Sequence, residues 1–314
     1  MSGLDEFGEI ARLFRPLTRG AAGALDLADD AAVIVPRPGC DLVVTKDALV
    51  EGVHFLPGEA PDMVARKLLR VNLSDLAAKA AEPFACFLAV AWPAAYTPAD
   101  RERFAQGLAS DLETFDLSLM GGDTVATPGP LTLSLTALGW VPHGGMVRRA
   151  GARPGDLLAV SGTIGDATLG LAALRGEVDD PEGALALRYR LPLPRLDLRH
   201  VLSAAHAAAD VSDGLVADAR HIAHASGVRL RLDLDRLPLS RAAATWLERQ
   251  ADAAAALLRL ASGGDDYEVV CALAPDRPKP AGLTIVGEVL EGEGIEVTAA
   301  GHPLEPGAGG WRHG

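Results

Sequence analysis

Aromatic residues and cysteine are both scarce in this sequence. Only 4% of its 314 residues are aromatic although 49% are hydrophobic, so its core must be built mainly from Ala, Leu and Val. The three cysteines, Cys40, Cys86 and Cys271, lie far apart and have no metal-ligand spacing. An odd number of widely spaced cysteines indicates reduced thiols in a cytoplasmic protein rather than a disulfide framework.

Long apolar runs and an excess of basic charge are also missing. No run approaches the roughly 18 apolar residues that a membrane-spanning helix needs, and the N-terminal MSGLDEFGEI carries acids where a basic leader would stand, so we expect neither export nor a membrane span. The net charge of −13 and the pI near 5.0 argue against nucleic acid and anionic membranes as partners, because both would be repelled. Divalent cations are partners that such a chain attracts.

The common signatures of nucleotide-binding proteins are absent as well. The sequence has no GxxxxGK[ST] loop, no GxGxxG after a strand, and no HRD or DFG motif of protein kinases. If this protein uses ATP, it must bind the phosphates by another design.

The length predicts two domains, since it exceeds the usual size of a single core. We place the boundary in the Gly- and Pro-rich connection near residue 145, which gives domains 1–145 and 146–314. The second half alternates predicted strands with helices, including one helix over 240–254, as is typical of an α/β or α+β domain. In the first half, apolar spacing predicts helices over 7–14, 62–81 and 98–115, and strands over 32–35, 42–45, 84–92, 117–120 and 131–141.

Acidic residues recur at the ends of these predicted elements. Each has an ordinary interpretation as loop charge, cap or turn; Asp75, for example, could pair with Lys79 four residues further along its helix. Similarly, His54 is by default a satisfied loop histidine, and Arg148 is by default solvated. The acids at strand ends, turns or helix faces are Asp29, Asp30, Asp47, Asp75, Asp123, Asp210 and Asp213.

Taken together, these acids offer oxygen ligands with no matching set of His and Cys. Such a set selects hard cations such as Mg²⁺, which binds through carboxylates, waters and substrate phosphates. The composition therefore points to phosphoryl chemistry, in which metal ions neutralise charge on the transferring oxygens. Gly121 and Gly122 allow a close approach of the backbone, whose N–H groups can bind phosphate oxygens.

Six motifs carry a resemblance to a known family. In chain order they are DDAA (29–32), DALVEGVHF (47–55), VNLSDLAA (71–78), GGDT (121–124), DVSDGL (210–215) and GGDDYE (263–268). They resemble the successive motifs of the thiamine-monophosphate kinases. The VEGVHF stretch separates this family from the aminoimidazole ribonucleotide synthetases, selenophosphate synthetases and hydrogenase-maturation proteins of the same superfamily.

The resemblance implies ATP-dependent phosphorylation of thiamine monophosphate to thiamine diphosphate, the last step of thiamine diphosphate biosynthesis. The transfer is direct and in line, with several Mg²⁺ ions and no catalytic side chain. The implied fold is the two-domain aminoimidazole ribonucleotide synthetase-like fold, an α/β (α+β) architecture. An N-terminal mixed sheet with helices on one face binds ATP and Mg²⁺ and forms a homodimer, an α+β domain follows, and the active site lies between the two.

The resemblance also assigns residues. Those implied to hold metal are Asp30, Thr45, Lys46, Asp47, Asp75, Asp123, Asp210 and Asp213. Those implied to contact ATP are Phe104, Gly122, Asp123, Arg148 and Ser212. Those implied to contact thiamine monophosphate are His54, Asp265 and Trp311.

Two positions depart from the family pattern. Lys46 replaces a hydroxyl residue beside the metal-binding Asp47, so that one metal contact comes from the backbone, is lost, or gives way to an ammonium–phosphate contact. Asp265 replaces a Glu and shortens the side chain by one methylene. The alternatives are another ATP-dependent enzyme of the superfamily, a non-catalytic nucleotide- or metal-binding relative, and a metal-dependent phosphohydrolase.

Overall fold

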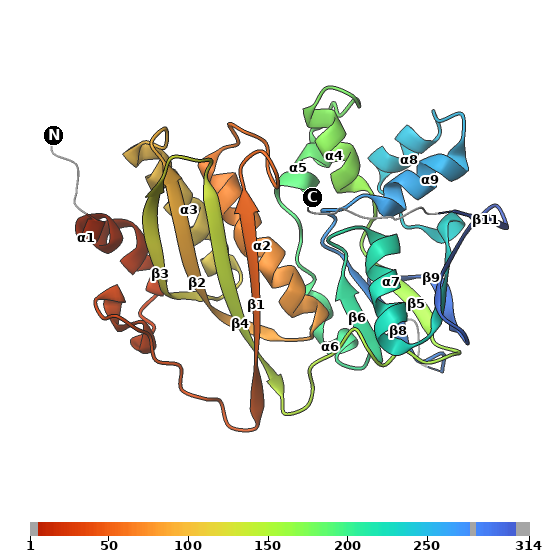
Figure 1. The fold of residues 1–314 in the computed structure, drawn as a ribbon, viewed down its shortest axis with the longest axis horizontal. Helices are drawn as coiled ribbons and strands as arrows, with labels where there is room; N and C mark the ends of the chain where they lie inside the picture. The colour runs from red at the N-terminus through yellow and green to blue at the C-terminus, as the bar shows by residue number, and fades with distance from the viewer. Residues whose placement is uncertain (1–5, 277–280, 306–314) are drawn as a thin grey trace. The chain divides into compact units, whose positions relative to one another are not determined.

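The computed structural model of the chain describes residues 6–276 and 281–305. Contacts divide the chain into two compact units, of which the first comprises residues 1–76 and 81–144 and the second residues 77–80 and 145–314. Each unit is built around a β-sheet of its own (Figure 1). None of the helices in the described part of the chain is long and apolar enough to cross a membrane.

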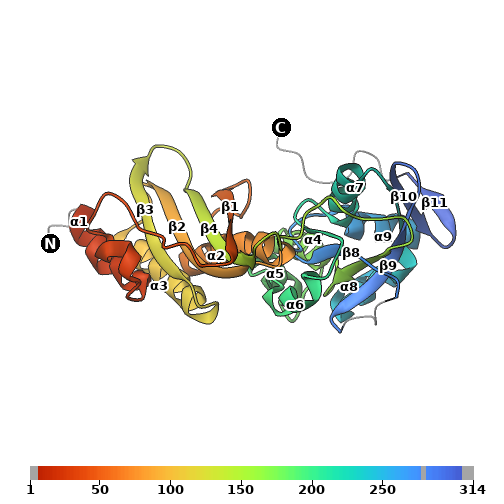
Figure 2. The same cartoon turned by 90° about the horizontal axis from the view of Figure 1, so that it is seen from below.

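The first unit is a four-stranded mixed sheet with the order β1-β4-β2-β3 and helices α2 and α3 on one face (Figure 2). Only the β2–β3 pair is parallel, and β1 and β3 form the two edges. This architecture confirms the predicted N-terminal fold. Its strands are β1 (Cys40–Val50), β2 (Glu82–Pro93), β3 (Ser118–Thr127) and β4 (Thr132–Pro142), and its helical segments are α1 (Glu6–Glu9), a π-helical turn (Ile10–Phe14), 3₁₀ turns (Arg15–Thr18, Ala22–Leu27), α2 (Pro61–Ala78) and α3 (Pro98–Thr114).

The two faces of this sheet differ because side chains alternate along each strand. In β1, Val43 and Leu49 are buried on the face that α2 and α3 cover. Leu42 and Val44 point to the opposite face, where they are 40% and 57% exposed. Register pairing places Val125 of β3 on that same face, 51% exposed. We call this surface the open face of the first unit.

Helix α3 begins as its sequence predicts. Thr97 forms a capping box with Asp100, and Pro98 occupies the first helical position. The fully buried Phe104 packs its ring edge-to-face on Trp92, with 5.3 Å between ring centroids.

A buried ion cluster joins α2 to α3. Asp111 is fully buried and accepts hydrogen bonds from Arg66 Nε at 3.0 Å and Arg70 Nε at 2.5 Å. Two guanidinium groups therefore offset the cost of removing one carboxylate from water.

The second unit contains a seven-stranded sheet with the order β11-β10-β7-β9-β5-β8-β6, mostly antiparallel but with β7 and β10 parallel. Its core confirms the predicted α+β class: Leu215, Ala219 and Ile222 of α7 share one face at helical spacing and pack among strand residues such as Val160 and Leu230. Its strands are β5 (Leu157–Ser161), β6 (Ala207–Asp210), β7 (Arg229–Asp233), β8 (Val269–Leu273), β9 (Leu283–Leu290), β10 (Gly294–Ala299) and β11 (His302–Leu304). Its helices are α4 (Asp166–Leu174), α5 (Ala184–Arg190), α6 (Arg199–Leu202), α7 (Leu215–Ser226), α8 (Arg241–Leu247), α9 (Ala253–Ser262) and two 3₁₀ turns (Leu196–Leu198, Leu234–Arg236).

Four predicted elements are wrong in detail. Residues 32–35 form no strand, and the helix predicted over 240–254 is two helices, because Asp252 caps a new one at α9. Strands β1 and β3 continue through Asp47 and Asp123, so these acids lie within strands rather than beyond their ends. The continuation determines which face of the sheet each acid occupies.

Candidate metal and nucleotide sites

The first acidic group lies where β1 meets α2. Asp47 and Thr45 are both half-buried and share the helix-covered face of β1. The Thr45 hydroxyl donates a hydrogen bond to Asp75 Oδ2 on α2, and the Asp47 backbone N–H donates to Asn72 Oδ1 at 3.1 Å. The structure thus brings together Thr45, Asp47 and Asp75, three of the predicted metal-binding residues.

This group carries negative charge without a matching basic side chain. Burial, and secondarily the nearby Asp75 carboxylate, raise the pKa of Asp47 to about 6. No ion pair between a basic side chain and Asp47 or Asp75 occurs in the part of the chain that the structure describes. Two adjacent carboxylates that lack a counter-charge form a site suited to a hard cation.

Lys46 does not belong to this group. Neighbouring residues of a strand point to opposite faces, and Lys46 lies exposed on the open face, whereas Asp47 faces α2. A protonated ammonium also has no lone pair to offer a metal. The Lys46 side chain is therefore corrected from a predicted metal ligand, and a metal contact from its backbone stays a prediction.

His54 is fixed in the turn that follows β1. The Val50 backbone N–H donates to His54 Nδ1 at 3.0 Å, which places the proton of the neutral ring on Nε2. The buried Lys67 donates to the His54 carbonyl oxygen at 3.1 Å. These two contacts hold the ring and the backbone of His54, and substrate binding by His54 stays a prediction.

A second acidic group lines a cavity of about 480 Å³ at edge strand β3. Asp30 and Asp123 contribute carboxylates, and Gly122 contributes backbone to its wall. Phe7 and Phe14, from the N-terminal helical segment, give the same cavity an aromatic side. The volume and the mixture of apolar and acidic groups are typical of a small-molecule pocket.

The glycine at position 122 is required by close packing. A Cβ atom there would lie only 1.9 Å from the Leu88 carbonyl oxygen of the neighbouring strand.

Phe104 does not line this cavity, and its ring is fully buried against Trp92. A ring without exposed surface cannot stack on adenine, so Phe104 is corrected from a predicted ATP contact to a core residue. Phe7 and Phe14, which do line the cavity, were not among the predicted site residues.

The two acidic groups of the first unit lie apart. β1 and β3 are opposite edges of the sheet, separated by three strand spacings, or about 14 Å. Register pairing also places Asp123 on the open face, whereas Asp47 points toward α2. The predicted metal ligands of this unit thus form two groups, Thr45 with Asp47 and Asp75, and Asp30 with Asp123.

The third acidic group lies in the second unit, in the turn between β6 and α7. Asp210, at the end of β6, is 5% exposed, and Ser212 and Asp213 follow it. The loop before β8 packs on this turn, with the Asp265 N–H donating to the Ser212 carbonyl oxygen at 2.9 Å. Four predicted site residues are thus adjacent here. The backbone of Arg148 runs beside β6, where its carbonyl oxygen accepts from the Ala208 N–H at 2.8 Å.

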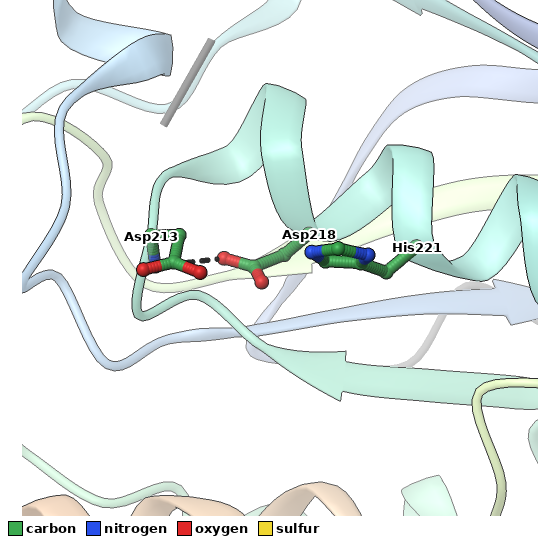
Figure 3. Close-up of side chains that lie close together, drawn as sticks. All are labelled: Asp213, Asp218 and His221. Atoms are coloured by element: carbon green, nitrogen blue, oxygen red, sulfur yellow. Dashed lines mark hydrogen bonds between the residues drawn. The ribbon is translucent and has the colours of Figure 1, made fainter. Parts of the chain in front are cut away.

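Asp218 also belongs to this group, although it was not among the predicted site residues. It is almost fully buried in the first turn of α7, and burial together with the nearby Asp213 raises its pKa to about 7. Figure 3 shows Asp213, Asp218 and His221 side by side, and one possible ligand atom from each lies within 4.8 Å of the others. The sequence signal was its position five residues after Asp213, one turn into a predicted helix.

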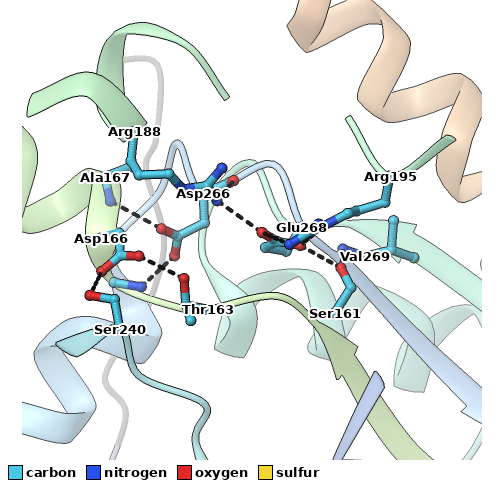
Figure 4. Close-up of polar contacts among 11 residues, drawn as sticks. Ser161, Thr163, Asp166, Ala167, Arg188, Arg195, Ser240, Asp266, Glu268 and Val269 are labelled. Carbon is cyan, nitrogen blue, oxygen red and sulfur yellow. Dashed lines mark hydrogen bonds and ion pairs between the residues drawn. The ribbon is translucent and has the colours of Figure 1, made fainter. Parts of the chain in front are cut away.

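A buried polar network supports the loop that carries Asp265 (Figure 4). Glu268 is fully buried and binds Arg188 at 2.8 Å and Arg195 at 2.5 Å, while its second oxygen also accepts from the Ser161 hydroxyl. Asp266 accepts the N–H groups of two residues at the start of α4, Gly165 at 2.7 Å and Ala167 at 3.1 Å. Trp311, the remaining predicted substrate contact, lies outside the described residues.

Comparison with known proteins defines the class. The family model "AIR synthase related protein, N-terminal domain" matches residues 28–141, and "AIR synthase related protein, C-terminal domain" matches residues 153–300. The chain is therefore an AIR synthase related protein.

Comparison with individual relatives identifies the family within this class. The chain is 58% identical to the thiamine-monophosphate kinase of Caulobacter vibrioides, covering 98% of this chain and 91% of the relative. A crystal structure of thiamine-monophosphate kinase from Stenotrophomonas maltophilia superposes with a TM-score of 0.81 at 37% identity, covering 93% of this chain and 98% of that one. The structure "AaThiL complexed with AMPPCP and TMP" gives a TM-score of 0.80 at 33% identity over the full length of both chains. The chain belongs to the thiamine-monophosphate kinase family, which confirms the resemblance read from its motifs.

We predict that Asp266→Asn flattens the dependence of stability on pH. Burial raises the pKa of Asp266 from 3.8 to about 8. A pKa raised by folding means that the stabilising contribution is complete below pH 3.8 and is lost as the pH rises toward 8. Asn cannot ionise, so the free energy of unfolding should fall less across this interval in the variant than in the wild type, as measured by urea denaturation at several pH values.

The matched control for that experiment is Asp235→Asn. Asp235 also accepts a backbone N–H, that of Ala300 at 2.7 Å, but it is exposed. The control should follow the wild-type pH profile. A profile of Asp266→Asn parallel to both would show that the buried carboxyl does not titrate as described.

Proposed function

We propose that this chain transfers the γ-phosphoryl group of ATP to thiamine monophosphate and so forms thiamine diphosphate. The observation that carries the proposal is the 58% identity to a thiamine-monophosphate kinase over 98% of the chain. The "AMPPCP and TMP" complex of a relative at 33% identity supports both substrates. Because the cysteines Cys40, Cys86 and Cys271 are free thiols, we also place the reaction in the cytoplasm.

Magnesium is the cation that we propose for the acidic groups. Their donors are carboxylate oxygens, and burial, together with the neighbouring Asp75 carboxylate, raises the pKa of Asp47, so that a cation beside these acids would favour the charged form. When bound, Mg²⁺ would neutralise charge on the phosphate oxygens during transfer. The residues that we propose to hold it are Asp30, Thr45, Asp47, Asp75, Asp123, Asp210 and Asp213.

The chain's own side chains and backbone would mainly bind and orient the substrates. We propose that Gly122 of the β3 cavity and Ser212 and Arg148 of the second unit contact ATP. His54 and Asp265 are proposed to contact thiamine monophosphate, as is Trp311. In-line transfer needs positioning more than acid–base catalysis, which agrees with the absence of a proposed general base.

We further propose a homodimer formed through the open face of residues 1–145, the domain to which we also assign ATP and Mg²⁺ binding. Leu42, Val44 and Val125 leave an apolar surface on that face. The separation of Asp47 from Asp123 across the sheet also favours a second copy, because one copy holds these acids about 14 Å apart.

The assay that tests the function is product analysis with ATP, Mg²⁺ and thiamine monophosphate. We expect ADP and thiamine diphosphate in equal amounts, with neither formed when thiamine monophosphate or Mg²⁺ is left out. Phosphate release without an acceptor would instead identify a phosphohydrolase. Turnover with aminoimidazole precursors or selenide, but not with thiamine monophosphate, would identify another activity of the superfamily.

We predict that Asp47→Asn lowers the rate of transfer by about 100-fold or more, or ~3 kcal/mol of transition-state stabilisation, because it removes an anionic ligand at a metal site. The fold should be retained, since Asn matches Asp in size and the change relieves a buried charge. Asp41→Asn, on the same strand, is the matched control and should leave the rate unchanged. Near-normal turnover of Asp47→Asn would remove Asp47 from the metal site.

For the homodimer, we expect Val44→Glu to yield a monomer in light scattering coupled to gel filtration. The substitution places a charge on a side chain that is 57% exposed in one copy and would be desolvated in the dimer. Leu187→Glu, at a side chain 51% exposed on α5 of the second unit, is the control and should remain dimeric. A wild-type monomer, or an unchanged dimer in Val44→Glu, would contradict this interface.

A further inference from the structure

The Asp218 side chain forms hydrogen bonds with the backbone of the turn between β6 and α7. Its Oδ2 atom accepts hydrogen bonds from two consecutive backbone N–H groups, those of Ser212 and Asp213, each at 3.1 Å. The side chain is only 1% exposed, and its Oδ1 atom has no hydrogen-bond partner among the residues that the structure describes. One buried oxygen thus fixes two successive peptide groups.

The opposite side of the same turn is fixed by backbone. The Ser212 carbonyl oxygen accepts from the Asp265 N–H at 2.9 Å, and a Cβ at Gly264 would come within 2.5 Å of that oxygen. Gly214 has a φ of +119° and leaves only 2.7 Å between a Cβ and the Ser262 carbonyl oxygen. Ser212 and Asp213 are therefore clamped between the loop before β8 on one side and Asp218 on the other.

Holding the turn in this way places the charged form of Asp218 in an unfavourable environment. Asp218 lies close to the Asp213 carboxylate, and burial further disfavours its charged form. A cap that served stability alone would need neither a second carboxylate close by nor a buried oxygen that lacks a hydrogen-bond partner in the described part of the chain. The arrangement instead fixes the directions in which Ser212 and Asp213 project.

We propose that Asp218 is a positioning residue for phosphoryl transfer, which orients Ser212 toward the nucleotide and Asp213 toward the metal by holding their backbone N–H groups. The inference rests on the proposed function. Residues that orient metal ligands typically contribute about 10- to 100-fold to metal affinity, and Asp218 acts on two proposed site residues through one atom.

The test compares Asp218→Ala with Asp218→Asn. The alanine variant loses both hydrogen bonds, so the Mg²⁺ concentration for half-maximal rate should rise about tenfold or more. Asn retains an acceptor oxygen at the same position and should stay within about threefold of the wild type. The KM for thiamine monophosphate should be unchanged in both, because Ser212 and Asp213 are assigned to nucleotide and metal.

Asp156 provides the matched control. It is 3% exposed in the same unit and also accepts a backbone N–H, that of Arg153 at 2.8 Å, but in a turn before β5. Asp156→Ala should lower the melting temperature without changing the Mg²⁺ requirement. If Asp218→Ala behaved in the same way, its role would be structural only. If Asp218→Asn were as impaired as Asp218→Ala, the charge rather than the positioning would matter.

Two further measurements test the proposal if Asp218→Ala does not fold or if the wild type shows no kinase activity. Hydrogen exchange of the wild type without Mg²⁺ should show protected N–H groups at Ser212 and Asp213, and rapid exchange there would overturn the clamp even if Asp218→Ala does not fold. Should the wild type show no kinase activity, calorimetry with Mg²⁺ and AMPPCP replaces the rate. Weaker binding by Asp218→Ala than by Asp218→Asn would then support the positioning role, and equal binding would refute it.

Discussion

The burial of carboxylates is the constraint on which this structure depends. Where a buried acid serves the fold, the chain supplies a compensating partner: Asp111 and Glu268 each bind two arginines, and Asp266 accepts two backbone N–H groups. Asp47 with Asp75, and Asp213 with Asp218, instead bring one carboxylate close to another. Asp47 and Asp75 have no ion pair with a basic side chain among the described residues, which separates this pair from Asp111 and Glu268, whereas Asp218, like Asp266, accepts two backbone N–H groups.

Local patterns predicted much of the fold. The Thr97-Pro98 start of α3 is capped as expected, because the signal lies within four residues and needs no tertiary information. Local patterns also bear on two residues whose predicted roles the structure corrects. Phe104, Leu108 and Leu112 are spaced by four residues and form one buried stripe, which favours a core position for Phe104, and strand alternation alone separates Lys46 from Asp47.

The grouping of the acids could not be read from the sequence, because it depends on sheet order. Asp47 and Asp123 both lie within strands, and the local sequence does not determine that β1 and β3 are opposite edges of the sheet rather than neighbouring strands. The motifs could assign both acids to metal through a family resemblance, but only the register shows that they face different sides of the sheet. Asp218 was missed for a similar reason, since it reaches the turn of Ser212 and Asp213 only after α7 forms.

The two units present different chemistry to a ligand. β3 is an edge strand, so alternate backbone N–H groups along Gly121 and Gly122 point away from β2 and are available to an anion. In the turn of Ser212 and Asp213, Asp218 already binds the corresponding N–H groups. That turn therefore cannot act as a backbone nest for phosphate, and it presents carboxylates and a hydroxyl instead. Under the proposed function, phosphate oxygens would meet the carboxylates of this turn through a cation and the Ser212 hydroxyl directly, which gives a physical reason why a protein without a P-loop concentrates acids in its DVSDGL motif.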